Sequence, residues 1–117
     1  MKTAGIIGGS GYTGGELLRL VLQHPNIVLD FVYSTTRPNT PLSDTHQDLL
    51  GTTNLNFTDQ INFDVDVVFL CLGNGNSSRF LKENEFSQQT IIIDLSNDFR
   101  LIADQNFGER TFVYGLP

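Results

Sequence analysis

Residues 5–16, which read GIIGGSGYTGGE, decide the fold of this 117-residue chain. An apolar stretch over residues 4–7 runs straight into a cluster of glycines, and an amphipathic run over residues 16–23 follows at once. The spacing fits G-x-G-x-x-G from Gly9 or G-x-x-G-x-x-G from Gly8. The stretch therefore predicts a strand, a tight glycine turn and the start of a helix, the arrangement that lays a pyrophosphate on a helix N-terminus.

Each residue type in this turn has a physical reason. A glycine that ends the strand can take backbone angles closed to other residues, and the next leaves no Cβ where phosphate oxygens approach. Gly14 would let the helix lie close against the strand. The hydroxyls of Ser10 and Thr13 suit phosphate binding or helix capping. The alternative is a glycine-rich turn that binds nothing.

Composition limits the classes of function. The net charge is −6 and there is no basic cluster, so nucleic acid and anionic membrane surfaces are poor partners. No run reaches the roughly 20 apolar residues that span a bilayer, and the first residues read as a strand rather than a signal peptide. The single cysteine, Cys71, excludes an internal disulfide. These features predict one domain in the cytoplasm.

The remaining hydrophobic pattern predicts alternating strands and helices. Two later apolar runs are nearly continuous, as expected for parallel strands covered on both faces. A strand–helix–strand order gives a right-handed crossover in nearly all proteins. The predicted fold class is therefore α/β, a Rossmann-like doubly wound and mainly parallel sheet with helices on both faces. Besides the first strand, strands are expected over residues 27–34, 54–57, 66–72 and 90–96, and helices over residues 16–23, 45–50 and 77–85.

The end of the second predicted strand bears on the choice of cofactor. A site for NAD usually has an acidic residue about 20 positions past the glycines, where it holds the ribose 2′-hydroxyl. Ser34, Thr35 and Arg37 occupy this place instead, and Asp30 falls inside the strand, about four residues too early for that role. Hydroxyls and a guanidinium can hold a 2′-phosphate. The pattern favours NADP over NAD, and an ordinary polar turn is the alternative.

Further candidate binding residues follow the strands predicted over residues 66–72 and 90–96, because ligands of a doubly wound sheet lie beyond the carboxyl ends of its strands. Residues 73–76 would face the ribose and nicotinamide half of a dinucleotide, or would form a plain turn. Residues 94–100 could serve a substrate, or could form an Asp–Arg pair on a solvated turn. We interpret His24 as a helix-end residue, His46 as a loop residue and Cys71 as a packed core thiol.

Five motifs occur in the order found in a known enzyme family. They cover essentially the whole chain, and together they resemble N-acetyl-γ-glutamyl-phosphate reductase of arginine biosynthesis. Related families are aspartate-semialdehyde dehydrogenase and the reductases of succinylated glutamyl or aminoadipyl phosphates. The motifs are SGYTG at residues 10–14, STTRP at 34–38, VVFLCLGNG at 67–75, DLSNDFRL at 94–101 and VYGLP at 113–117.

The resemblance implies the NADPH-dependent reduction of an acyl phosphate to a semialdehyde. In this family a cysteine thiolate attacks the acyl phosphate, the resulting thioester accepts hydride, and a histidine handles the protons. Many relatives have Pro-His-Gly where this chain has Gly73-Asn74-Gly75. The cofactor contacts carried over by position are Gly8, Ser10, Gly11, Tyr12, Thr13, Gly14, Ser34, Thr35, Arg37, Leu72, Gly73, Asn74, Gly75 and Ser96.

The catalytic cysteine and histidine of the family follow the YGLP segment, on a separate α/β substrate domain. Cys71, His24 and His46 occupy no matching position. The resemblance therefore implies that residues 1–117 are the N-terminal NADP-binding domain, inactive alone and without catalytic or metal-binding residues, of an enzyme that forms homo-oligomers. Such a domain is expected to expose apolar residues within residues 112–116, where its partner domain would pack.

Two other interpretations stay open. One is a stand-alone NADP-sensing module without catalysis, which would bind cofactor tightly and expose no large apolar patch. The other lies within the same class, a relative of aspartate-semialdehyde dehydrogenase or of N-succinyl-glutamyl-phosphate reductase. The motifs SGYTG and DLSNDFR disfavour aspartate-semialdehyde dehydrogenase, and the sequence does not distinguish an acetyl from a succinyl group on the substrate.

Overall fold

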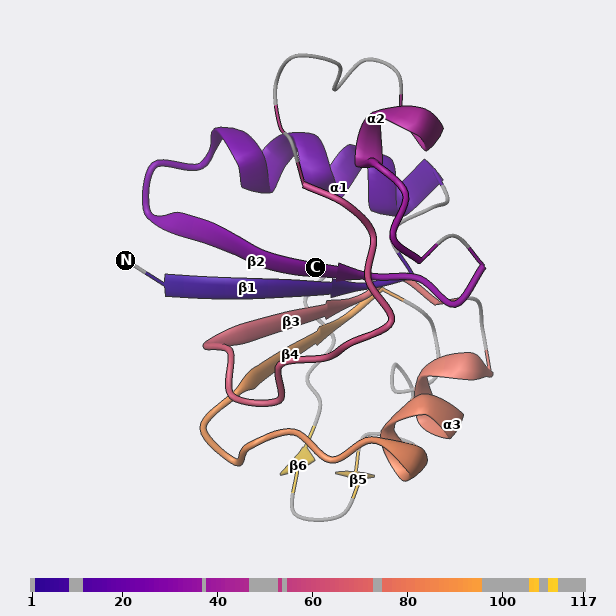
Figure 1. Cartoon of the computed structure of the whole chain (residues 1–117). Helices are drawn as coiled ribbons and strands as arrows, with labels where there is room; N and C mark the ends of the chain where they lie inside the picture. The colour runs from indigo at the N-terminus through magenta and orange to yellow at the C-terminus, as the bar shows by residue number, and fades with distance from the viewer. Residues whose placement is uncertain are drawn as a thin grey trace.

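A computed structural model shows a parallel sheet with helices on both of its faces (Figure 1). It describes residues 2–8, 12–36, 38–46, 53, 55–72, 75–95, 106–107 and 110–111. The sheet contains β1 (Lys2–Ile7), β2 (Ile27–Tyr33), β3 (Val67–Leu70) and β4 (Ile91–Asp94), in the order β2-β1-β3-β4 with all pairs parallel. The helices are α1 (Tyr12–Gln23), α2 (Leu42–Thr45) and α3 (Asn76–Glu83), and β5 (Asn106–Phe107) pairs antiparallel with β6 (Arg110–Thr111). This architecture confirms the predicted Rossmann-like class.

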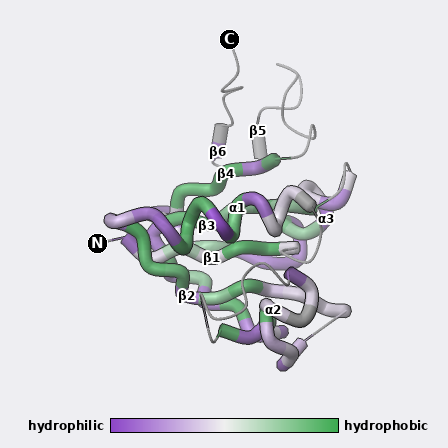
Figure 2. Tube along the Cα trace, turned by 90° about the horizontal axis from the view of Figure 1, so that it is seen from above, coloured by the Kyte–Doolittle hydropathy of each residue, from purple (hydrophilic) through white to green (hydrophobic). Residues whose placement is uncertain are grey.

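Two hydrophobic cores lie on opposite faces of the sheet, one beneath α1 and one beneath α3. Successive strand residues point to opposite faces, so Ile6 joins the α1-side core and Ile7 the α3-side core. Leu18 and Val21 bring the apolar stripe of α1 onto the sheet, and Leu81 does the same for α3. The strands between the helices carry most of the hydrophobic colour in Figure 2.

An extra residue in β2 changes which face its side chains cover. Ala4 pairs with Leu29 but Gly5 pairs with Phe31, so Asp30 is bulged out of the ladder. Leu29 consequently belongs to the α1-side core and Phe31 to the α3-side core, although only one residue separates them. The ring of Phe31 then lies directly over Gly5, where an added Cβ would stand 2.2 Å from two ring carbons.

The starts of β1 and β3 are joined through one carboxylate. The backbone N–H of Thr3 donates to Oδ2 of Asp66 at 2.8 Å, and the Thr3 hydroxyl lies 3.3 Å from the same oxygen. In return, the backbone N–H of Asp66 donates to the Thr3 hydroxyl oxygen at 3.2 Å. The hydrogen bonds from Thr3, with the nearby positive charge of Lys2, lower the pKa of Asp66.

Several element ends differ from the sequence prediction. Helix α1 begins at Tyr12 rather than at the run 16–23, so Gly14 lies inside the helix. Helix α2 starts after the extended Pro41 and overlaps the helix predicted over residues 45–50 only at Thr45; His46 is not helical, and residues 47–50 lie outside the described ones.

The strand predicted over residues 54–57 is also wrong for the residues that the structure describes. Only isolated bridges occur there, between Asn56 and Pro41 and between Thr58 and Tyr33. Thr58 exchanges backbone hydrogen bonds with Val32 and Ser34 at the outer edge of β2. The pair of β5 and β6 was not predicted, and residues 112–117 lie outside the described part of the chain.

We expect Gly5→Ala to lower the free energy of unfolding by about 1 to 3 kcal/mol, because the new methyl group overlaps the buried Phe31 ring. Urea unfolding would measure this, and Phe31→Leu in the same chain should relieve part of the cost. Gly75→Ala is the matched control: its φ is +85° but an added Cβ meets no atom within 4 Å. If Phe31→Leu relieved both variants equally, the overlap would not be the cause.

Asp66 predicts a dependence of stability on pH. Its folded-state pKa lies below the unfolded value, so the stabilisation is complete above the unfolded pKa of about 4 and is lost as pH falls through the folded pKa. Asp66→Asn should therefore be less stable than the unaltered chain at pH 7, and the two should converge in acid. Urea unfolding from about pH 7 to about pH 2 would test this. Asp64→Asn, at an exposed neighbouring carboxylate, serves as the control.

Candidate functional site

The carboxyl ends of β1 to β4 meet at one edge of the sheet, because all four strands are parallel (Figure 1). From β1 the chain proceeds to β2 on one side, and it later returns to β3 on the other side of β1. In open α/β sheets, ligands bind outside the carboxyl ends of the strands where the strand order reverses in this way. The candidate site therefore lies beyond the ends of β1, β2 and β3.

Gly8 stands at this switch point, where hydrogen bonds join the carboxyl ends of three strands. Its N–H donates to the carbonyl of Tyr33 in β2 at 3.1 Å, while the N–H of Cys71, just after β3, donates to the carbonyl of Ile7 at 2.8 Å. The φ of Gly8 is +83°, and an added Cβ would lie 2.9 Å from the carbonyl oxygen of Cys71. Both the backbone conformation and the space therefore require glycine here.

The rest of the predicted phosphate-binding turn leads into α1. Tyr12 and Thr13 open the helix, Thr13 is exposed and Gly14 is buried. Ser10 and Gly11 lie outside the described residues. The N-terminus of α1 thus follows closely on Gly8, and a helix N-terminus attracts anions through its free N–H groups and its dipole.

The end of β2 carries a pair of hydroxyl groups. Ser34 is 4% exposed, and its N–H donates to the carbonyl of Thr58 at 3.0 Å. Its hydroxyl lies 3.2 Å from that of Thr36, and Thr35 is exposed. Arg37 lies outside the described residues. Ser34 directly follows Tyr33, whose carbonyl accepts from the N–H of Gly8, so this predicted position lies one residue from a partner of Gly8.

Leu72 and Gly75 flank the same edge on the side of β3. A Cβ at Gly8 would lie 3.1 Å from a methyl carbon of Leu72, so these two predicted positions are neighbours. Gly75 has a φ of +85° and caps the N-terminus of α3. Gly73, Asn74 and Ser96 lie outside the described residues.

A hydrogen bond that was not predicted from the sequence fixes α3 to the sheet. The hydroxyl of Ser77, fully buried in the first turn of α3, donates to Oδ1 of Asp94 at 2.6 Å. Asp94 ends β4, and the next N–H, of Leu95, donates to the carbonyl of Leu70. A lone carboxylate within the apolar run IIIDL was the available signal, because a charge placed there requires a polar partner.

Cys71 faces a chemical environment that suppresses its reactivity. It packs against the α1-side core, and burial, followed by the negative charge of Asp94, raises the pKa of its thiol to about 11. A thiol is nucleophilic only as the thiolate, so Cys71 is a poor nucleophile at neutral pH.

Both histidines make structural contacts. The Nδ1 of the exposed His24 accepts from the N–H of Asn26 at 3.1 Å, just after α1. The ring of His46 lies 2.8 Å from the place of an added Cβ at Gly15 and packs against Phe57 with 6.4 Å between ring centroids. His46 thus fastens the segment after α2 onto α1.

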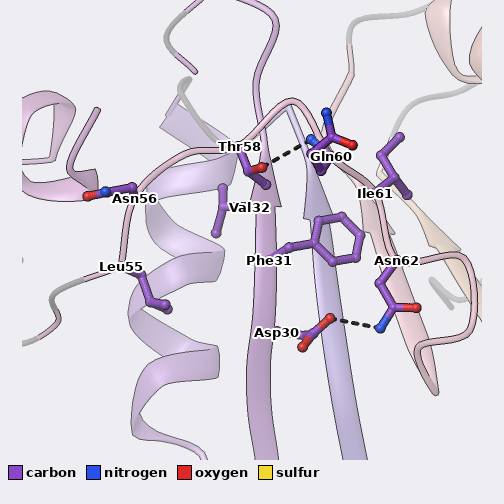
Figure 3. Close-up of a pocket in the computed structure, with 9 residues that line it drawn as sticks. All are labelled: Asp30, Phe31, Val32, Leu55, Asn56, Thr58, Gln60, Ile61 and Asn62. Carbon is purple, nitrogen blue, oxygen red and sulfur yellow. Dashed lines mark hydrogen bonds between the residues drawn. The ribbon is translucent and has the colours of Figure 1, made fainter. Parts of the chain in front are cut away.

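A pocket of about 370 Å³ lies at the outer edge of β2, apart from the switch point (Figure 3). The side-chain amide of Asn62 donates to Oδ2 of Asp30 at 2.9 Å across it. The bulge therefore directs the only carboxylate of β2 into this pocket rather than toward the end of the strand. None of the predicted cofactor contacts is among the lining residues, which are Asp30, Phe31, Val32, Leu55, Asn56, Thr58, Gln60, Ile61 and Asn62.

The described residues contain neither a metal-binding cluster nor a membrane-spanning helix. No three of their His, Cys, Asp or Glu side chains gather in a way that could hold a metal ion. Among the same residues, no helix combines the length and the apolar character needed to cross a membrane.

A protein-family model, semialdehyde dehydrogenase NAD binding domain, matches residues 3–117. The chain belongs to this family. It is therefore a nucleotide-cofactor-binding domain of the dehydrogenase type, and the family supports a nicotinamide cofactor. A solved structure, aspartate semialdehyde dehydrogenase with NADP from Candida albicans, has a TM-score of 0.67 and is 16% identical over 87% of this chain and 31% of its own. At that identity it shows the shared fold.

Curated relatives confirm the resemblance seen in the sequence. The chain is 59% identical over its full length to N-acetyl-gamma-glutamyl-phosphate reductase of Flavobacterium johnsoniae, and it covers 36% of that protein. Its identity to the reductase of the same name from Christiangramia forsetii is 56%, with 35% of that protein covered. The corresponding reductase of Bacteroides thetaiotaomicron is 42% identical. The chain thus spans about a third of the length of these relatives.

Asp94→Asn should lower the pKa of Cys71, because it removes the negative charge that opposes thiolate formation. The pKa should stay above that of an exposed thiol, since burial is the larger cause. The rate of iodoacetamide alkylation as a function of pH measures the change. Asp30→Asn, which removes a carboxylate at the opposite sheet edge, should leave the profile where it was. An unmoved profile in Asp94→Asn would show that this carboxylate does not act on the thiol.

Proposed function

We propose that this chain is the NADP-binding domain of an N-acetyl-γ-glutamyl-phosphate reductase. The observation that carries the proposal is the 59% identity over the full chain with such a reductase, in a chain whose Gly8 stands at the switch point of the sheet. The catalytic cysteine and histidine would lie in the remaining part of a longer polypeptide, on a separate substrate domain. The raised pKa of Cys71 supports this division, because a catalytic thiol needs an accessible thiolate.

The proposed site uses this chain to bind and orient the cofactor. Residues 8–14 would receive the pyrophosphate at the N-terminus of α1, where free N–H groups favour an anion. The nicotinamide half of the cofactor would be lined by Leu72, Gly73, Asn74, Gly75 and Ser96. A nicotinamide bound there would supply hydride to a thioester formed on the cysteine of the separate substrate domain. The contact of Leu72 with Gly8 supports a continuous surface from one half of the site to the other.

NADP is the proposed cofactor because of the end of β2. Ser34, Thr35 and Arg37 stand where a carboxylate of an NAD site would repel a 2′-phosphate. Asp30, the nearest acid, is bonded to Asn62 at the outer edge of the strand. Its engagement there supports a role outside ribose binding.

The whole enzyme would be a cytoplasmic homo-oligomer that acts in arginine biosynthesis. Its substrate would be an acyl phosphate, which NADPH reduces. Neither nucleic acid nor a membrane would be a partner, as the net charge of −6 and the lack of a basic cluster suggest.

Calorimetric titration with NADP and, separately, NAD tests the cofactor assignment. We expect saturable binding with NADP preferred, and Arg37→Ala should weaken NADP binding by about 10- to 100-fold while leaving NAD binding nearly unchanged. The loss corresponds to one charge-assisted pair with the 2′-phosphate. Arg19→Ala, at an exposed arginine paired with Glu16 on α1, is the control and should change neither affinity. Equal or better binding of NAD would overturn the assignment to NADP.

A further inference from the structure

Residues 55–58 lie between the end of β2 and the segment that follows it, and we call them the clip. On the β2 side, the N–H of Thr58 donates to the carbonyl of Val32 at 2.9 Å. The carbonyl of Thr58 accepts from the N–H of Ser34 at 3.0 Å. Figure 3 shows Thr58 beside Val32 at this edge of the sheet. The clip is therefore bonded to the carboxyl end of β2.

The other side of the clip bonds the chain that leads to α2. The N–H of Asn39 donates to the carbonyl of Phe57 at 2.8 Å, and the N–H of Phe57 donates to the carbonyl of Thr40 at 2.8 Å. The N–H of Leu42 donates to the carbonyl of Leu55 at 3.0 Å. Asn39 has a φ of +64°, a left-handed conformation that asparagine adopts more readily than most residues. This conformation lets the chain turn back onto the clip.

The two ends of one short loop are consequently bonded to consecutive residues of the clip. Ser34 precedes the loop and is bonded to Thr58, whereas Asn39 follows the loop and is bonded to Phe57. The loop between them consists of residues 35–38. A loop whose ends are already fixed has fewer conformations to lose when its side chains bind a ligand.

The side chain of Phe57 anchors the clip in the α1-side core. Phe57 is 1% exposed and belongs to that core together with Leu18 of α1. The centroid of its ring lies 6.4 Å from that of His46. His46 in turn lies beside Gly15 in the first turn of α1, where an added Cβ would be 2.8 Å from two atoms of the imidazole ring. Phe57 and His46 therefore form a packed connection from the clip to the start of α1.

This connection joins the two places where the proposed site would hold phosphate. The pyrophosphate would lie at the N-terminus of α1, and the 2′-phosphate would lie at residues 34–37. Both groups of NADP are attached to one ribose, so the two places can be occupied together only when their separation matches the cofactor. NAD has no 2′-phosphate and does not depend on that separation.

We propose that Phe57 is a positioning residue for the preference for NADP: together with His46, it holds the loop that carries Arg37 at a fixed distance from the start of α1. The inference rests on the NADP site of the proposed function. Phe57 is too buried to touch a cofactor, so it acts through the backbone hydrogen bonds of the clip to Ser34 and Asn39. Loss of its ring would loosen the loop without removing any group that binds phosphate.

Calorimetric titration of the full-length polypeptide with NADP and, separately, NAD tests the inference through the ratio of the two affinities. Phe57→Leu keeps an apolar side chain but removes the ring that packs on His46. We expect this variant to weaken NADP binding by about 3- to 10-fold, the cost of ordering one long side chain, and NAD binding by less than about two-fold.

Phe86→Leu is the matched control. Phe86 is also buried, at 5% exposed, but it lies in the α3-side core and its ring packs on Phe63 with 5.1 Å between centroids. The control loses a comparable amount of packing far from the clip. We expect it to leave the ratio of NADP to NAD affinity unchanged.

A double variant shows whether the effect of Phe57 passes through the guanidinium. Arg37→Ala alone removes the charge that the loop would position, so adding Phe57→Leu to it should weaken NADP binding no more than NAD binding. If Phe57→Leu misfolds by circular dichroism, His46→Ala replaces it. This second variant should lower the same affinity ratio, because it removes the other ring of the same contact.

Several results would overturn the inference. Equal weakening of NADP and NAD in Phe57→Leu, or an equal fall of the ratio in Phe86→Leu, would indicate a general loss of packing. A fall of the ratio that persists in the Arg37→Ala background would show that Phe57 does not act through the guanidinium. A preference for NADP that is unchanged in Phe57→Leu would overturn this inference alone. Absence of any preference in the unaltered protein would overturn the cofactor assignment as well.

Discussion

The hydrogen bonds around Gly8 are the constraint on which the rest of the structure depends. This residue leaves β1 in a left-handed conformation, donates to β2 and lies against the backbone that follows β3. A side chain here would push the chain away from Cys71 and disturb the pairing of the central strands at their carboxyl ends. The same residue leads the chain toward the N-terminus of α1. The geometry of the sheet and that of the candidate site therefore both depend on Gly8.

The parts of the fold that could be predicted are those with strong local signals. Some elements can be identified within a short window of sequence. The signals are the apolar run of β3, the glycine turn, and the change from strand to helix periodicity. The resemblance in five ordered motifs led to the family, which the match over residues 3–117 now shows. Gly8 in the glycine turn and Gly75 after the strand predicted over residues 66–72 were both candidate positions, and both have positive φ in the structure.

The parts that could not be predicted arise from contacts between distant residues. The sequence around Asp30 does not indicate a bulge, because the extra residue is defined only by the register of β2 against β1. The position of α2 at Leu42–Thr45 depends on Phe57 and Leu55, two residues that lie outside the helix and contact its segment. The bond from Ser77 to Asp94 joins elements whose approach is fixed only in the folded sheet. Several cofactor candidates, such as Arg37 and Ser96, lie outside the described residues and stay predictions.

The environment of Cys71 has a chemical consequence for a thiol-dependent enzyme. A second reactive cysteine near a catalytic one could exchange disulfides with it or be oxidised alongside it. With a pKa of about 11, Cys71 is ionised in roughly one molecule in ten thousand at pH 7. The thiol of Cys71 is therefore a poor participant in disulfide exchange or oxidation at neutral pH. An electrophile applied at neutral pH to the proposed full-length reductase would therefore leave Cys71 largely unmodified and react with more acidic thiols elsewhere.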